Sequence, residues 1–224
     1  MATVIAVLNS KGGSGKSTIS TNLAGALQLD GHSVIIADSD PQGTARDWRQ
    51  VQDEDSDLPG VVGIDRPTLE KDTKEINHAF DFIVIDGAAK LQEMIVSAVK
   101  AADVILIPVQ PSAADIWAVS EMVEVIKTRQ EITDGRPKAC FVINRAIVRT
   151  NVAAEVDEAV DAYGIPILNA RTHQRIAFVE ALAEGSTVVH SAKGSKAADE
   201  ITNIKNELLE FIHGKEKEHT IERR

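Results

Sequence analysis

The sequence predicts an α/β fold in which a doubly wound, mostly parallel sheet is flanked by helices. Short apolar runs alternate with helical stretches along the 224 residues, and this order is typical of successive strand–helix–strand units. Several runs are almost continuously apolar, as strands are when helices cover both faces of their sheet. The expected strands are Thr3–Leu8, Ser33–Ala37, Phe82–Ile85, Val104–Val109, Ala139–Ile143 and a weaker one at Ile165–Leu168.

The expected helices follow from apolar spacing and from the glycines that come just after several of them. They are Ser17–Leu29, Leu91–Ala101, Ala113–Ile132, Asn151–Tyr163, His173–Glu184 and Lys196–His213. Nothing in the sequence marks a boundary between two domains, so we expect one domain over residues 1–213. Residues 214–224 are mostly charged or polar and include one aliphatic side chain, which predicts a flexible tail.

The net charge of -10 is unevenly distributed along the chain. Residues 51–170 carry 11 basic and 21 acidic side chains, whereas residues 171–224 carry nine of each. A local basic surface in the C-terminal part is therefore compatible with an acidic protein. The N-terminus has no basic, signal-like segment, and no run approaches the roughly 20 apolar residues of a membrane span, so we expect a cytoplasmic location.

A glycine-rich segment, Ser10-Lys-Gly-Gly-Ser-Gly-Lys-Ser17, joins the first strand to the first helix. It matches the phosphate-binding pattern G-x-x-x-x-G-K-[ST] everywhere except at the first glycine. Glycines at such a turn let backbone N–H groups converge on an anion, and the helix N-terminus adds favourable dipole charge. In this pattern Lys16 reaches the β- and γ-phosphates of ATP, and the Ser17 hydroxyl is a ligand of Mg²⁺.

The same segment, extended to Thr18, resembles the deviant Walker A loop of the ParA/MinD family of ATPases, in which a second, signature lysine lies near the start of the loop. The resemblance implies that Lys11 is this lysine, and that two subunits dimerise around two ATP molecules. Lys11 of one subunit would then reach the phosphates bound by the other, which couples nucleotide state to association. Catalytic roles fall to Lys11 and Lys16, and the nucleotide-binding loop comprises Gly12, Gly13, Ser14, Gly15, Lys16, Ser17 and Thr18.

Two acidic motifs follow apolar strands, where ligands bind in open α/β sheets. The segment Ala37–Gly43 is similar to the family's D-x-D-P-Q-G motif, which implies that Asp38 holds Mg²⁺ or its waters and that Asp40 positions the attacking water. Alone, such a carboxylate pair is equally typical of a solvated turn or a helix cap. The strand that ends at Asp86 has the Walker B arrangement, which places a carboxylate beside the Mg²⁺ water shell.

Two later strand ends are also similar to family motifs. The segment Val109–Asp115 is assigned by this resemblance to the dimer face or an effector surface. The resemblance also implies that Asn144, with Arg145 beside it, contacts the adenine edge of the nucleotide. Without the family context, an Asn at a strand end is more often a turn residue.

Four basic residues in the C-terminal third are candidates for contacts with DNA phosphates, because long basic side chains neutralise backbone charge without reading bases. An equally good interpretation is a solvated face with ion pairs to Glu180 and Glu184. The four candidates are Arg171, Arg175, Lys193 and Lys196.

The function that the resemblance implies is an ATP-dependent partition or positioning switch of the small, single-domain ParA type. ATP closes a homodimer, the dimer binds DNA non-specifically and joins the nucleoid, and an adaptor or cargo-linked protein stimulates an otherwise weak hydrolysis. The cargo would be a plasmid, a chromosome locus or a protein body. No membrane partner is expected.

Three alternatives share this fold. A membrane-cycling, MinD-like ATPase requires an amphipathic C-terminal helix, whereas the final eleven residues contain only Ile221 as a bulky apolar residue. An iron–sulfur carrier is disfavoured because Cys140 is the only cysteine, and we expect it to be a buried, inert thiol. A biosynthetic ligase would use ATP to activate a small acid, and the arrangement of Lys11 with the paired acids does not point to one.

Overall fold

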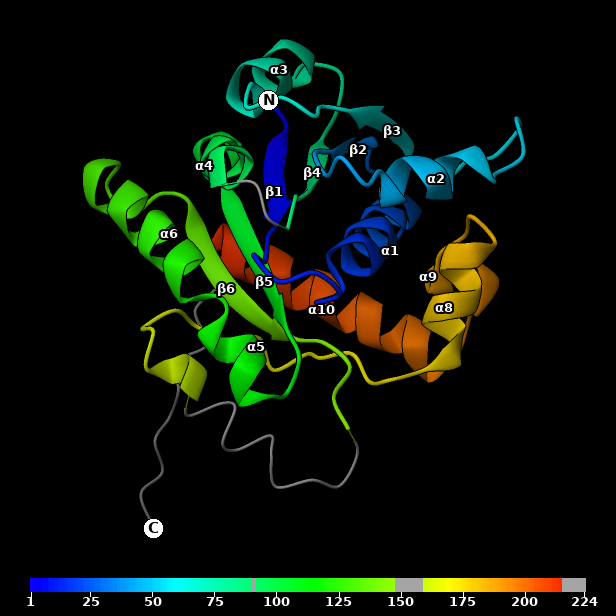
Figure 1. The fold of residues 1–224 in the computed structure, drawn as a ribbon. Helices are drawn as coiled ribbons and strands as arrows, with labels where there is room; N and C mark the ends of the chain where they lie inside the picture. Colours follow the sequence, from blue (N-terminus) through cyan, green and yellow to red (C-terminus); the bar gives the residue numbers. More distant parts are fainter. Residues whose placement is uncertain (90–91, 148–158, 215–224) are drawn as a thin grey trace.

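A six-stranded sheet forms the centre of the molecule, and all of its strand pairs are parallel (Figure 1). The structure is a computed structural model that describes residues 1–89, 92–147 and 159–214. The strand order is β3-β2-β4-β1-β5-β6, so the first strand lies inside the sheet. The strands are β1 (Thr3–Val7), β2 (Val34–Asp38), β3 (Gly60–Gly63), β4 (Phe82–Asp86), β5 (Val104–Val109) and β6 (Lys138–Ile143).

Helices cover both faces of this sheet, which confirms the doubly wound fold predicted from the sequence. One face packs against α3 (Leu69–Ile76), α4 (Gln92–Ala101), α5 (Ala113–Trp117) and α6 (Ser120–Ile132). The other face packs against α1 (Lys16–Leu29), α2 (Thr44–Gln50), α8 (Ile176–Ala183), α9 (Val188–Ser191) and α10 (Lys196–His213).

Alternation along β1 shows how the two cores are separated. Val4 and Ala6 belong to the first core, and Ile5 and Val7 belong to the second. Successive side chains of a strand point to opposite faces, so a buried strand supplies both cores. The predicted buried thiol is confirmed, since Cys140 in β6 is fully buried within the second core.

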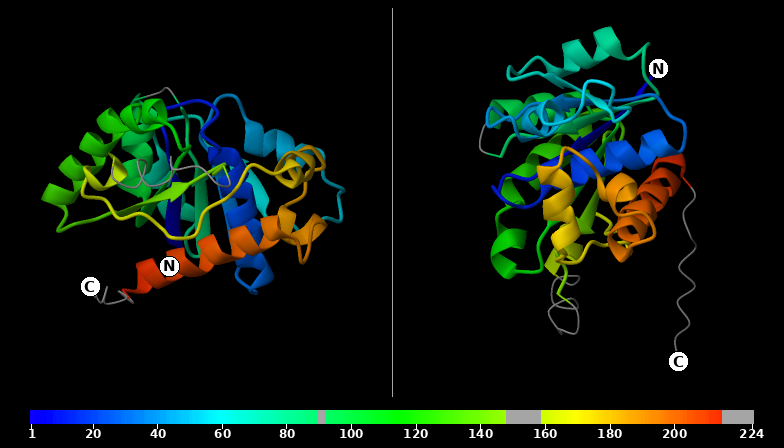
Figure 2. Two further views of the ribbon diagram at one scale, coloured as in Figure 1. Left: turned by 90° about the horizontal axis from the view of Figure 1, so that it is seen from below. Right: turned by 90° about the vertical axis from the view of Figure 1, so that its right-hand side faces the viewer.

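Helix α10 is the longest helix over the described residues, and it packs beside α1 on the second face (Figure 2). Its Lys205 forms an ion pair with Asp30, the residue that follows α1. Among the residues that the structure describes, no helix is long and apolar enough to cross a membrane.

Several sequence-based boundaries were wrong. Ile165–Leu168 is not a strand, because it makes only an isolated bridge between Ile167 and Phe141. The helix expected over Ala113–Ile132 is interrupted between α5 and α6, where Ser10 donates a hydrogen bond of 2.5 Å to the carbonyl of Ala118. The strand β3 was missed because it has four residues, two of them glycines, and pairs with β2 alone at the sheet edge.

Two further expectations fall partly on residues outside the described ranges. Of the helix expected at Asn151–Tyr163, only the end is described, and residues 159–161 are helical. The expected tail over 214–224 lies outside the described residues except for Gly214, which ends α10 in a left-handed conformation with φ of 75°. The short helices α2, α3 and α9 were not expected.

Candidate nucleotide-binding site

The candidate site begins at the glycine-rich loop between β1 and α1. Gly13 and Gly15 have φ angles of 77° and 98°, in the left-handed region that favours glycine. Gly15 directly precedes α1, whose first backbone N–H groups have no acceptor within the helix. A β carbon at Gly12 or Gly13 would meet no atom within 4 Å, so this side of the loop faces open space. The loop therefore presents amide groups at a helix N-terminus, an arrangement that binds phosphate.

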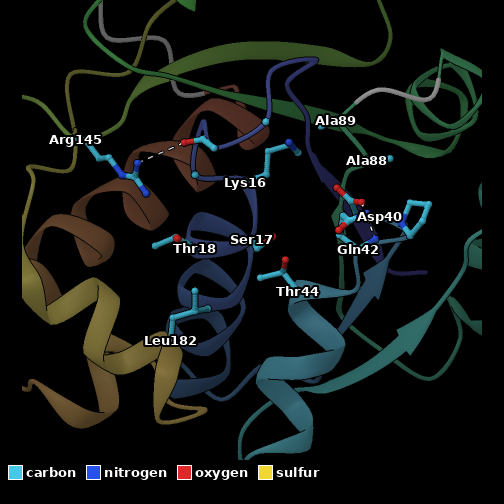
Figure 3. Close-up of a pocket in the computed structure, with 14 residues that line it drawn as sticks. Lys16, Ser17, Thr18, Asp40, Gln42, Thr44, Ala88, Ala89, Arg145 and Leu182 are labelled. Carbon is cyan, nitrogen blue, oxygen red and sulfur yellow. Dashed lines mark hydrogen bonds between the residues drawn. The ribbon is translucent and has the colours of Figure 1, made fainter.

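A cavity of about 570 Å³ lies over this loop (Figure 3). Asp40 and Arg145 lie on opposite sides of Lys16 in this view, and Arg145 donates a hydrogen bond of 3.4 Å to the carbonyl of Gly13. Of the predicted loop, Ser14 is buried beneath the surface, and its hydroxyl has no hydrogen-bond partner. The other predicted loop residues line the cavity, namely Gly12, Gly13, Gly15, Lys16, Ser17 and Thr18.

Lys16 is buried and its ammonium group lies among the acids of the site. Burial lowers the pKa of Lys16, and the negative charges of Asp86 and Asp40 oppose this effect. Its Nζ donates a hydrogen bond of 3.3 Å to the carbonyl of Lys11, so the side chain folds back over its own loop. A triphosphate would offer this ammonium stronger acceptors than a carbonyl oxygen.

Two carboxyl groups stand side by side at the carboxyl ends of neighbouring strands. Asp38 of β2 and Asp86 of β4 are paired positions in the sheet, and both are fully buried. Burial raises the pKa of Asp86 to about 7, although the Ser17 hydroxyl stabilises its ionised form. One oxygen of Asp86 accepts a hydrogen bond of 3.0 Å from Ser20, and the other oxygen has no partner.

These residues fit a hydrated Mg²⁺ ion. Asp86 has one unpaired, buried carboxylate oxygen, and its carboxyl group interacts with the Ser17 hydroxyl. Together the two residues offer the hard oxygen ligands or water acceptors that Mg²⁺ prefers. Within the described part of the chain, no group of three or more His, Cys, Asp or Glu side chains is placed to hold a metal alone. The ion would therefore depend on nucleotide phosphates and water for most of its ligands.

Asp38 is held by groups that the sequence analysis did not identify. Its carboxylate accepts hydrogen bonds from the backbone of Arg46 and of Asp40, both at 3.0 Å, and it is 3.3 Å from the guanidinium Nε of Arg46. Burial still raises the pKa of Asp38 against these interactions. Asp40 lines the cavity, and its own carboxylate accepts a hydrogen bond of 3.0 Å from the backbone of Gln42.

Lys11 points away from the phosphate cavity of its own chain. Its Nζ lies 2.9 Å from a carboxylate oxygen of Asp115, and the Lys11 side chain remains 42% exposed. Asp115 is nearly buried; Ser112 donates to the same oxygen, and the other oxygen has no partner. The segment Val109–Asp115 therefore supplies the partner of the predicted signature lysine in this structure.

A second cavity of about 760 Å³ adjoins the first and shares three lining residues with it, Thr18, Arg145 and Leu182. Its wall includes the apolar side chains of Phe178 and Val179. A nucleotide with its phosphates on the loop would reach this second cavity with its base, and the apolar wall suits a base.

Asn144 lines the second cavity and is buried at the end of β6. Its amide nitrogen donates a hydrogen bond of 2.7 Å to the carbonyl of Ser14, and its oxygen accepts one of 2.5 Å from Thr172. An amide side chain has a second N–H and a further lone pair. The contact with an adenine edge implied by the resemblance stays a prediction, and it would use these remaining groups.

The four basic residues predicted for DNA do not line the phosphate cavity. Lys193 and Lys196 are exposed near the start of α10, and Arg171 hydrogen-bonds to the carbonyl of Asn169 at 3.3 Å. Arg175 forms an ion pair of 2.6 Å with Glu200 of α10. For Arg175, therefore, the ion-pair partners suggested by the sequence, Glu180 and Glu184, were wrong.

The fold and this site together define a class of protein. A parallel α/β sheet with a phosphate loop after β1, a buried lysine on that loop and carboxyl groups at the ends of β2 and β4 is the arrangement of a P-loop nucleotide-binding protein.

Comparison with known proteins identifies the family within this class. Residues 5–188 match the CobQ/CobB/MinD/ParA nucleotide binding domain. The chain is 34% identical over 212 residues to the maintenance of carboxysome distribution protein A of Halothiobacillus neapolitanus, covering 93% of this chain and 97% of that protein. It is 24% identical over 205 residues to the protein ParA of Rhizobium radiobacter, covering 91% of each. The chain therefore belongs to the ParA/MinD family of nucleotide-binding ATPases.

A solved structure supports the fold. The septum site-determining protein MinD of Pyrococcus horikoshii, complexed with Mg-ADP, superposes with a TM-score of 0.75 at 21% identity, covering 97% of this chain and all of that one. At this level of identity the likeness supports the fold alone.

Proposed function

We propose that this chain is an ATPase that partitions or positions a cargo, and that it works as an ATP-dependent homodimer. The observation that carries the proposal is the position of Lys11. It follows the residue that replaces the first glycine of the loop, it is half exposed, and it does not line its own phosphate cavity. A lysine in this place is available to a second subunit.

The residues of the cavity divide the chemistry between them. Backbone N–H groups of the loop and the Lys16 ammonium bind the phosphates and stabilise the charge that builds up as the γ-phosphate leaves. When bound, Mg²⁺ would be held by the Ser17 hydroxyl and, through water, by Asp38 and Asp86, and would neutralise phosphate charge. Asp40 would position the attacking water, and Arg46 keeps the turn that carries Asp40 in place through Asp38 and the Asp40 carbonyl.

Dimerisation would complete the site. Lys11 would exchange its partner Asp115 for the phosphates held by the other subunit. The Lys11 side chain is 42% exposed, so its ammonium group is reachable from outside the chain although Asp115 is nearly buried. The several negative charges of a triphosphate would compete with the single carboxylate for this ammonium group. The switch from one acceptor to the other would tie association to ATP.

We further propose that the ATP-bound dimer binds DNA non-specifically in the cytoplasm, and that an adaptor or cargo-linked protein stimulates hydrolysis and releases it. Support comes from the names of the relatives, which include a carboxysome distribution protein and a ParA protein. The relative with carboxysome distribution in its name matches over nearly its whole length, which favours a protein body as cargo over a plasmid. Lys193, Lys196 and Arg171 are the proposed phosphate contacts.

The proposal is tested with Lys16→Ala and Lys11→Ala. We expect Lys16→Ala to lose ATP binding, because it removes the ammonium group of the loop. Lys11→Ala should keep most ATP binding in calorimetry and lose ATP-dependent dimerisation in light scattering. Dimerisation of Lys11→Ala at wild-type strength would refute the role of this lysine in a second subunit.

Measurements on the wild-type protein distinguish this function from that of a biosynthetic ligase. The wild-type protein should hydrolyse ATP slowly without any organic acid, and it should be retained on duplex DNA with ATP but not with ADP. Equal retention with both nucleotides, or none with ATP, would contradict the DNA switch.

A further inference from the structure

Two carboxylates of α10 hold an irregular segment, residues 169–175, that runs beside the end of β6. Glu207 accepts hydrogen bonds from the backbone of Asn169 at 2.9 Å and of Ala170 at 2.7 Å. Glu200 accepts one from the backbone of His173 at 3.0 Å and lies 2.6 Å from the Nδ1 atom of its ring. Glu200 also pairs with Arg175 through Nε at 3.0 Å and through the guanidinium end at 2.6 Å.

Glu200 is more than a surface ion pair. Its side chain is 12% exposed, and its two oxygens receive four donors, one of them a main-chain N–H. Charged hydrogen bonds of this kind are stronger and more directional than exposed pairs. Residues 169–175 belong to no named helix or strand. Backbone hydrogen bonds join Thr172 to Ile143 and Ala146, and the two carboxylates of α10 hold the residues on either side of Thr172.

This segment places Thr172 beside the end of β6. Thr172 is buried; its hydroxyl donates to the Asn144 oxygen at 2.5 Å and accepts from the backbone of Arg145 at 3.0 Å. Asn144 in turn donates to the carbonyl of Ser14, inside the phosphate loop, at 2.7 Å. A β carbon at Gly15 would lie 1.9 Å from the Asn144 amide nitrogen, so this amide is packed directly against the loop.

We propose that Glu200 is a positioning residue of the nucleotide site, acting through Thr172 and Asn144. Glu200 accepts from the backbone of His173, the neighbouring Thr172 donates to Asn144, and Asn144 donates to Ser14 in the phosphate loop. This path of contacts sets the orientation of the Asn144 amide and the wall of the second cavity. His173 and Arg175, the two residues that Glu200 holds, both line that cavity. The inference rests on the nucleotide-binding function proposed above and deepens it, since it assigns the side of the site that takes the base.

Two conservative variants test this path at two different contacts. Glu200→Gln keeps the side-chain shape but replaces one acceptor oxygen with an NH₂ group, so it cannot accept from all four donors. Thr172→Val keeps the volume and removes the hydroxyl that binds Asn144. Glu210→Gln is the matched control, because Glu210 is an exposed acid on the same helix.

The measurement compares the affinity for ATP with that for magnesium tripolyphosphate, which occupies the phosphate loop without a base. We expect Glu200→Gln and Thr172→Val each to weaken ATP binding about three- to tenfold, the range for one lost hydrogen bond, with tripolyphosphate affinity within about twofold of wild type. Because the two substitutions interrupt the same path of contacts, the double variant should bind ATP about as weakly as the weaker-binding single variant. Glu210→Gln should match wild type for both ligands.

Other results would overturn the inference. If the affinities for both ligands fall equally, Glu200 acts only on the stability of the fold. If neither affinity falls, this path of contacts has no role in binding. Wild-type protein that binds neither ligand would instead refute the nucleotide-binding function itself, and Lys16→Ala, which should lose both ligands, marks that baseline.

Discussion

Replacing Asp86 by asparagine tests whether the buried carboxyl group at the end of β4 destabilises the nucleotide-free fold. Burial raises the pKa of Asp86 from 3.8 to about 7. Between these two pH values the folded chain keeps a proton on Asp86 that the unfolded chain has released. The free energy of unfolding therefore falls as the pH rises from about 4 to about 7, and this group causes no further change above 7.

The size of the effect follows from the shift in pKa. The difference between a pKa of 3.8 and one of about 7 corresponds to about 4 kcal/mol, which is an upper limit because water entry and local relaxation reduce the penalty of a buried charge. Asparagine has the same shape and does not titrate. We expect Asp86→Asn to match wild type near pH 4 and to be more stable by roughly 2 to 4 kcal/mol at pH 8.

Urea unfolding of the nucleotide-free and magnesium-free protein measures this difference, with the fluorescence of the buried Trp48 as the signal. Asp81→Asn is the control, because Asp81 is exposed just before the same strand and a backbone hydrogen bond from Ser33 lowers its pKa. Relative to wild type, the Asp81→Asn control should gain no stability as the pH rises. An Asp86→Asn variant that keeps the pH slope of wild type, or that is less stable at pH 8, would refute the reasoning.

The glycine-rich loop, the Lys11–Asp115 pair and the basic residues near the start of α10 give three further predictions. Gly15→Ala puts a β carbon 1.9 Å from the Asn144 amide nitrogen, at a position whose backbone is left-handed, so it should lower the free energy of unfolding by roughly 1 to 3 kcal/mol. Gly12→Ala is the control, because it has open space around it and should leave thermal unfolding unchanged. Asp115→Asn weakens the partner of the signature lysine, so ATP-dependent dimerisation should tighten about two- to fivefold in light scattering; weaker association would contradict a competing pair. Lys193→Ala and Lys196→Ala should each reduce the slope of log affinity for duplex DNA against log salt by about 0.9, and an unchanged slope would remove that lysine from the DNA surface.

The parts of the site that could be predicted from the sequence are those fixed by local chain order. A glycine loop between the first strand and the first helix must lie at the carboxyl edge of a parallel sheet, and acids that end neighbouring strands must meet there. Asp38 and Asp86 are 48 residues apart in the sequence, yet their strands pair so that the two acids stand opposite each other.

The parts that could not be predicted depend on contacts between distant elements. The sequence suggested either a DNA contact or an ion pair for Arg175, but no local pattern indicates that Glu200, 25 residues later, is its ion-pair partner. Thr172 has the composition of an ordinary loop residue, and only the path of the segment brings its hydroxyl to Asn144. The edge strand β3 could not be predicted for the same reason. Its two glycines are not typical of a strand, and only its pairing with β2 identifies it.

The segment at residues 169–175 has a consequence for how the protein is observed. The backbone amides of Asn169, Ala170 and His173 are held by side-chain carboxylates rather than by a helix or a sheet ladder. Such amides exchange their hydrogens with solvent whenever this one segment opens, without unfolding of the core. Their exchange rates therefore measure the local stability of the base-side wall, and a ligand that binds against this wall should slow them while leaving the exchange of the central strands unchanged.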